Sequence, residues 1–198
     1  EMARTYWLWR DDLPAATETL LNFVAAAPAD SRAPEALNLA ANIAERDGTP
    51  GVAQAAEVWE RLASEYPSSP QASLAAFDSG VVLFRVGEFN SAAQRFEQSA
   101  SLTTDPARLA AARLWVGKCA AAVGDSAGAR AAWEAATALD PTGYYSVRAA
   151  GLLAGRPPFF PALSLDDLRF AYAGIRTKRD DGTPEPDFHI AIDRADPP

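Results

Sequence analysis

The stretch that decides the fold reads GVVLFRVGEFNSAAQRFEQSASLTTDP over residues 80–106, and its pattern returns as GKCAAAVGDSAGARAAWEAATALDP over residues 117–141. Each copy starts with a glycine, places a second glycine seven residues later, continues with an alanine-containing segment around one large aromatic residue, and closes on Asp-Pro. These marks recur every 37 residues, at Gly80 and Gly117, at Gly87 and Gly124, and at Trp59, Phe96 and Trp133. A period of this length indicates stacked supersecondary units rather than one closed core.

Composition places the chain among folded proteins and limits its partners. The 198 residues are 48% hydrophobic and 22% charged, a balance typical of one globular domain or a short array of helix pairs. The formal net charge of −8 disfavours nucleic-acid binding, which needs a basic surface for the phosphates. No stretch of the sequence approaches the ~18 apolar residues of a membrane-spanning helix, so we expect no membrane span.

Helix signals follow one another along the first 155 residues. A helical pair or its remnant is expected in residues 4–27, and further helices are expected at 34–46, 52–66, 71–86, 89–103, 107–123, 126–139 and 143–154. Residues 47–51 (Asp-Gly-Thr-Pro-Gly) predict a turn, Ser69 before Pro70 predicts an N-cap, and Gly155 predicts a helix end. We therefore expect one helical domain over residues 1–155.

Residues 156–198 have a different character. Arg156–Pro161 contains three prolines, which cannot continue a helix and mark a boundary. Ser164–Asp167 resembles a capping box and predicts a short helix over about 164–176. The polar, proline-rich remainder has only a weak strand pattern at 188–192. We expect a proline-rich connector, a short helix and a weakly structured tail.

The residues inside each copy resemble the tetratricopeptide repeat, a pair of antiparallel helices. Two copies match that family's small and aromatic positions, with Ala76, Gly80, Gly87, Ala92 and Phe96 in one and Gly117, Gly124, Ala129, Trp133, Ala136 and Pro141 in the next. An earlier copy keeps Ala55, Trp59 and Pro67 but has Ile43 in place of the first glycine. The resemblance implies an all-α, right-handed solenoid of tetratricopeptide-like helix pairs, with repeats at about 31–67, 71–106 and 107–141.

That resemblance also implies a binding groove lined by the first helix of each repeat. The family's groove positions fall on Leu37, Leu74, Phe77, Val81, Phe84, Leu114 and Lys118. The row is mainly apolar, and it lacks the lysine, asparagine and arginine cluster with which some repeat domains clamp a peptide carboxylate. Such a groove suits an amphipathic helix of a partner or another segment of the same protein. The alternative that several of these residues only pack within their own repeat stays open.

A second, narrower resemblance covers residues 140–153, which read DPTGYYSVRAAGLL. The segment is similar to the helix that ends the superhelical region of soluble lytic transglycosylases, exported bacterial enzymes that act on peptidoglycan. This implies a periplasmic, extracellular or cell-envelope scaffold that positions a catalytic domain outside this chain, with peptidoglycan as the glycan ligand. A cytoplasmic location stays open, because a single cysteine fits either compartment. Because Glu1 precedes Met2 and the chain stops at Pro198 without a closing element, we expect it to be a piece of a longer protein. The alternative function is a stand-alone protein-interaction module of the bacterial cell envelope.

No residue of this sequence is assigned a catalytic, cofactor-binding or metal-binding role. The Glu-Ser pair and the Gly-Leu-Met-Gln segment of the transglycosylases are absent, and residues 171–174 (Ala-Tyr-Ala-Gly) lack the asparagine of their third motif. His189 is the only histidine, and with no cysteine nearby a metal site is not expected there. Cys119 is the only cysteine and is expected to be a buried, unreactive thiol.

Overall fold

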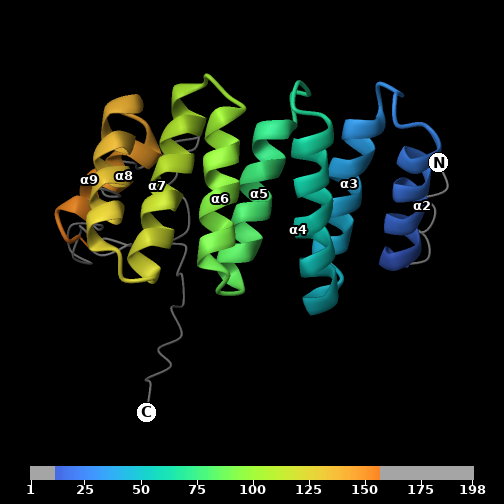
Figure 1. Ribbon diagram of the computed structural model, residues 1–198, viewed down its shortest axis with the longest axis horizontal. Helices are drawn as coiled ribbons and strands as arrows, with labels where there is room; N and C mark the ends of the chain where they lie inside the picture. The colour runs from blue at the N-terminus through green and yellow to red at the C-terminus, as the bar shows by residue number, and fades with distance from the viewer. Residues whose placement is uncertain (1–11, 157–198) are drawn as a thin grey trace, which may run out of the picture. The chain divides into compact units, whose positions relative to one another are not determined.

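The computed structural model describes residues 12–156, except for the side chains of residues 49 and 50. In this range the regular structure is helical and consists of α2 (Leu13–Ala26), α3 (Ala33–Glu45), α4 (Gly48–Glu65), α5 (Ala72–Arg85), α6 (Phe89–Ser101), α7 (Pro106–Ala122), α8 (Ser126–Leu139) and α9 (Tyr144–Leu153). Each helix packs against the next in the chain, and the helices stand side by side in chain order (Figure 1). The all-α solenoid predicted from the repeat is confirmed. The connector, short helix and tail expected after Arg156, and the part of the first helical pair before Asp12, lie outside the described residues.

Short glycine turns join the two helices of each repeat. Gly87 and Gly124 have φ angles of 88° and 84°, in the left-handed region that glycine adopts without a Cβ penalty. After each of them the next amide donates back across the turn, from Glu88 to the carbonyl of Leu83 at 2.9 Å in the first case. This hydrogen bond completes a Schellman-type helix end, so the recurring glycine is a requirement of the backbone.

Two local predictions are wrong. Residues 47–51 were expected to form a turn, but α4 already begins at Gly48, because the φ of 73° at this single glycine reverses the chain. Pro50 then falls in the first helical turn, where no amide hydrogen is needed. Ser69 was expected to cap α5, but that helix begins at Ala72 with Gln71 at the cap position and no side-chain cap bond. The Ser69 amide instead donates to the Tyr66 carbonyl in the preceding turn, and the Ser69 Oγ has no hydrogen-bond partner among residues 12–156.

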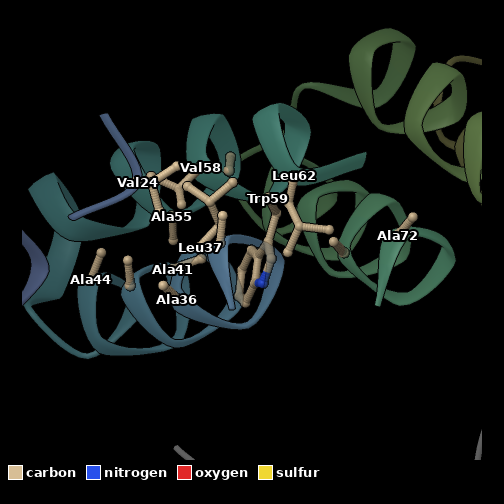
Figure 2. Packing of buried hydrophobic residues seen from close by; sticks show 14 of the residues in the cluster. Val24, Ala36, Leu37, Ala41, Ala44, Ala55, Val58, Trp59, Leu62 and Ala72 are labelled. Carbon is tan, nitrogen blue, oxygen red and sulfur yellow. The ribbon is translucent and has the colours of Figure 1, made fainter. Parts of the chain in front are cut away.

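The core is a series of clusters along the helix row. The first cluster joins α2, α3, α4 and α5, and Figure 2 shows Leu37, Val58, Trp59 and Leu62 packed among alanines. Further clusters centre on Phe96 with Cys119 and on Leu114 with Ala136 and Ala149. Alanine supplies much of this buried surface, which lets neighbouring helices approach closely.

The repeated glycine and the repeated aromatic residue meet in space. A Cβ added at Gly80 would lie 2.8 Å from the Phe96 ring, and one at Gly117 would lie 2.3 Å from Nε1 of Trp133. Each ring therefore lies directly on the backbone of the first helix of its repeat. Trp133 also donates its indole N–H to the carbonyl of Leu114 at 3.1 Å.

Candidate functional site

The first helices of the three repeats, α3, α5 and α7, share one surface with the following helix α9, and we call this surface the inner face. The ion pair between Arg85 of α5 and Glu45 of α3, at 2.7 Å, spans from one first helix to another. Helix α9 likewise contacts α7 directly, past the intervening α8. Helix α5 therefore lies between α3 on one side and α7 on the other, and its side chains decide what this face can bind.

Two rows of side chains run along α5. Leu74, Asp78, Val81 and Arg85 follow spacings of four, three and four residues, which places them in one stripe. Leu74 is 47% exposed, a large value for an aliphatic side chain on a packed helix. The second row is apolar and consists of Phe77, Val81 and Phe84, all of them partly buried. The inner face therefore has a polar side toward α3 and an apolar side toward α7.

The apolar side is built around Trp115 of α7. Its indole stacks on Phe96 with the centroids 5.5 Å apart, and it meets Phe84 edge-on at 5.2 Å and Phe77 at 6.3 Å. Phe77 and Phe96 also form an edge contact at 5.2 Å. Such offset and edge geometries are the favourable ones for aromatic pairs, so these rings form a rigid wall.

Lys118 covers this wall. Its Nζ lies 3.6 Å from the centroid of the Trp115 ring and 5.7 Å from that of Phe84. Burial and the nearby Arg148 charge lower the pKa of the Lys118 ammonium. Within the described residues, Lys118 contacts mainly the two aromatic rings. These cation–π contacts hold its positive charge over the aromatic wall.

The polar side is acidic. Asp78, Glu45 and Asn42 line a pocket of about 140 Å³ together with Trp59, Val81 and Val82. Burial, and secondarily the charge of Glu45, raises the pKa of Asp78 to about 6. Glu45 is paired with Arg85, whereas Asp78 has no hydrogen bond or ion pair among residues 12–156. The pocket thus offers an unneutralised carboxylate to any group that enters it.

One turn toward the N-terminus of α5 lies an apolar pocket of about 130 Å³. Its walls come from α5, α6, α7 and α9, and consist of Ser73, Leu74, Phe77, Ser99, Ala107, Arg108, Ala111 and Tyr145. The lining is mostly carbon, and Arg108 is the one charged residue among the described residues that form it. A pocket of this size accommodates a single aliphatic or aromatic side chain.

The structure brings together five of the seven groove residues named from the sequence. Leu74, Phe77, Val81, Phe84 and Lys118 lie on the inner face around α5 and α7. Leu37 is 0% exposed and packs with Val24 and Trp59, and Leu114 is 3% exposed beneath α8 and α9. Neither of these two can contact a ligand in this conformation, because adjacent helices cover them.

Sequence reasoning missed four residues that shape the face: Asp78, Arg108, Trp115 and Tyr145. Asp78 and Trp115 are 37 residues apart and occupy the same repeat position, so the period itself could have located them. This repeat position is not among the family's groove positions. The sequence therefore did not indicate that Asp78 and Trp115 contact the neighbouring repeat.

A wider hollow of about 620 Å³ lies at the loops between helix pairs. It is lined by residues of the two loops and helix ends, namely Ser31, Pro34, Glu35 and Glu65–Gln71. Tyr66 closes part of it by donating its hydroxyl to the Pro28 carbonyl at 2.9 Å. The hollow contains no cluster of aromatic or charged side chains comparable with that of the inner face.

Other chemistry is limited in the described residues. No group of three or more His, Cys, Asp and Glu residues within residues 12–156 is placed to hold a metal ion. Cys119 is buried, and burial raises the pKa of its thiol to about 11, so the thiolate is scarce at neutral pH. None of the described helices is both long and apolar enough to span a membrane.

Comparisons with known proteins bear on the fold. No family model and no curated protein matches the sequence. A crystal structure of MamA is similar with a TM-score of 0.57 and 17% identity, covering 78% of this chain and 84% of that one. A second MamA structure has a TM-score of 0.54, 18% identity and 74% coverage of both chains. A Podosopora anserina protein with nearly identical TPR-like repeats, named for kinesin light chain, has a TM-score of 0.53 and 16% identity, and covers 78% of this chain and 81% of that one.

At these identities the likeness shows the fold alone. The chain has a TPR-like repeat fold. The resemblance of residues 140–153 to lytic transglycosylases receives no support from these comparisons.

Proposed function

We propose that the chain is a protein-interaction scaffold whose inner face binds a segment of a partner protein. The observation that carries this proposal is Leu74, a half-exposed aliphatic side chain at the mouth of an apolar pocket. Apolar side chains that are left exposed beside a preformed pocket are typical of surfaces that bind a partner. The adjacent aromatic wall of Phe77, Phe84 and Trp115 extends the apolar surface along the same face.

Site-specific photo-crosslinking in cells that express the protein tests this function. A benzophenone amino acid replaces Leu74 in one strain and Val147 in another. Val147 is a suitable control because it is 56% exposed on α9 but does not line the pocket. We expect a discrete protein adduct from position 74 that is absent or much weaker at position 147. Equal adducts at both positions, or none at position 74, would contradict the proposal.

A matched pair of substitutions makes the test quantitative. Leu74→Asp and Val147→Asp both place a carboxylate in the first turns of a helix, where the helix dipole tolerates it. Only Leu74→Asp should abolish capture of the crosslinked partner by the purified chain. Phe77 and Phe84 are less suitable targets, because both rings pack on Trp115 and their loss would also destabilise the fold.

A second candidate is the helical scaffold region of a lytic transglycosylase-like parent in the cell envelope. It is favoured by α9, which forms over the segment that carries the resemblance, with Tyr145 packed in the cluster around Leu114. The coding sequence beyond Pro198 tests it. The candidate requires Glu-Ser, Gly-Leu-Met-Gln and Ala-Tyr-Asn-Ala-Gly motifs within the following ~150 codons, about one domain. Release of muropeptides from sacculi by this chain alone would overturn it as a non-catalytic scaffold.

A further inference from the structure

Leu74 and Asp78 lie one turn apart on α5 and line two neighbouring pockets of different character. Leu74 lines the apolar pocket of about 130 Å³, and Asp78 lines the acidic pocket of about 140 Å³. Four residues of helix correspond to a rise of about 6 Å, which is also the rise between residues i and i+4 of a bound helical peptide. A single short segment can therefore reach both pockets.

The acidic pocket has a charge imbalance that the described chain does not correct. Asp78 and Glu45 contribute two carboxylates, and Arg85 neutralises only Glu45. The pKa of Asp78 is raised to about 6, first by burial and then by the charge of Glu45. A guanidinium or ammonium group entering from solvent would supply the missing hydrogen bonds and charge.

The opposite side of α5 has the reverse charge. Lys118 sits over Trp115 and Phe84, and Arg148 is close enough to lower its pKa. Arg108 also lines the apolar pocket and forms an ion pair with Asp105, with Nε 3.6 Å from Oδ2. A uniformly basic partner would be repelled on this side, so a complementary segment has its basic residue only toward α3.

We propose that the inner face binds a peptide segment in which a large apolar residue is followed or preceded, within four residues, by arginine or lysine. The apolar residue fills the pocket between Leu74, Phe77 and Tyr145, and the basic residue pairs with Asp78. This specificity rests on the proposed function, since it defines the partner of the same face.

Selection from a displayed library of random 12-residue peptides tests the inference with the full chain as bait. We expect the enriched peptides to share a leucine, phenylalanine or similar residue with arginine or lysine within four positions. A synthetic peptide of the enriched sequence should then bind Asp78→Asn about tenfold or more weakly, the loss expected for a hydrogen-bonded charge pair. Because the carboxyl is already disfavoured as an ion, the Asn variant should fold normally.

Two controls separate the outcomes. Glu57→Gln removes one charge from an exposed position on α4 and should change binding less than twofold. Leu74→Asp should abolish binding of every enriched peptide. Apolar peptides without a basic bias, or equal losses in Asp78→Asn and Glu57→Gln, would overturn the specificity while leaving the scaffold function intact. No enrichment on the wild-type chain beyond that on Leu74→Asp would overturn both.

Discussion

The junction between the first and second repeats and the junction between the second and third repeats use the same positions with opposite chemistry. Asp78 and Trp115 are 37 residues apart and face the preceding repeat in each case. Asp78 meets Glu45, Asn42 and Trp59 across a small polar pocket. Trp115 fills its junction with stacked and edge-on rings.

This difference indicates that the same backbone arrangement can stabilise the fold at one junction and leave polar groups available for binding at another. The aromatic junction excludes water and buries apolar area, which is the main stabilising contribution in folding. The acidic junction leaves Asp78 without a partner among residues 12–156, which costs stability and, in the proposal above, makes the carboxylate available for binding. A solenoid permits this division because each repeat contacts only its neighbours.

The largest effect is expected from Trp115→Ala. The change removes a ring that contacts Phe77, Phe84 and Phe96, and should lower the free energy of unfolding by about 3 kcal/mol. Urea denaturation followed by far-UV circular dichroism measures it. Trp115→Phe keeps one ring and should recover about half of the loss. A loss of less than about 1 kcal/mol would show that the aromatic junction does not stabilise the fold more than the acidic junction does.

Gly117→Ala should destabilise the same region by about 1–3 kcal/mol. The added Cβ would lie 2.3 Å from Nε1 of Trp133, so the ring must move, and this overpacking exceeds the helix-propensity gain of about 1 kcal/mol. Gly151→Ala is the matched control in α9, since its Cβ would meet nothing closer than 3.4 Å. Thermal unfolding should show a lower midpoint for Gly117→Ala and an unchanged or higher one for Gly151→Ala. The reverse order would contradict the close contact of Gly117 with Trp133.

Asp78→Asn should stabilise the protein at pH 7, by about 1 kcal/mol once the partial solvent contact of the carboxyl is allowed for. The folded-state pKa of Asp78 is raised to about 6, so the folded protein binds this proton more tightly than the unfolded chain. The stability contributed by neutral Asp78 is fully present below about pH 4 and is lost as the pH rises to about 6. Urea unfolding at pH 4 and pH 7 should show a gain for the variant only at pH 7. An equal gain at both values would exclude ionisation as its cause.

The repeat period predicted most of the fold, because the glycine and aromatic positions have local physical causes. Gly87 and Gly124 are required by a left-handed backbone, and Gly80 by the ring that lies on it. Two predicted helix starts were wrong. Helix α4 begins at Gly48, inside the predicted turn, and α5 begins at Ala72, beyond the cap predicted at Ser69. The spacing of apolar residues along a helix could not locate these two helix starts.

The candidate site was less predictable than the fold. A groove position shows which helix carries a residue, but burial depends on which other helix covers it. Leu37 and Leu114 occupy groove positions and are covered by adjacent helices, whereas Leu74 is not. Asp78 lies close to Glu45, an acidic rather than a basic residue, and this proximity arises from the packing of two repeats. Sequence spacing did not contain that information.

The smallest effect, and the sharpest test of the two junctions, is expected from Glu45→Gln. The substitution removes an exposed ion pair with Arg85, worth at most about 1 kcal/mol, and at the same time relieves the repulsion on Asp78. These effects oppose each other, so the net change at pH 7 should lie within about 0.5 kcal/mol of zero. In the Asp78→Asn background only the ion-pair loss remains, and Glu45→Gln should then be clearly destabilising.

A double-mutant cycle at two pH values isolates this coupling. We expect an interaction energy of about 0.5 kcal/mol between positions 45 and 78 at pH 7. It should vanish near pH 4, where Asp78 carries a proton in the folded state. The corresponding cycle of Phe84→Leu with Trp115→Phe involves no charge, so its coupling should be the same at both values. Coupling at positions 45 and 78 that persists at pH 4 would mean that packing, rather than charge, distinguishes the acidic junction from the aromatic one.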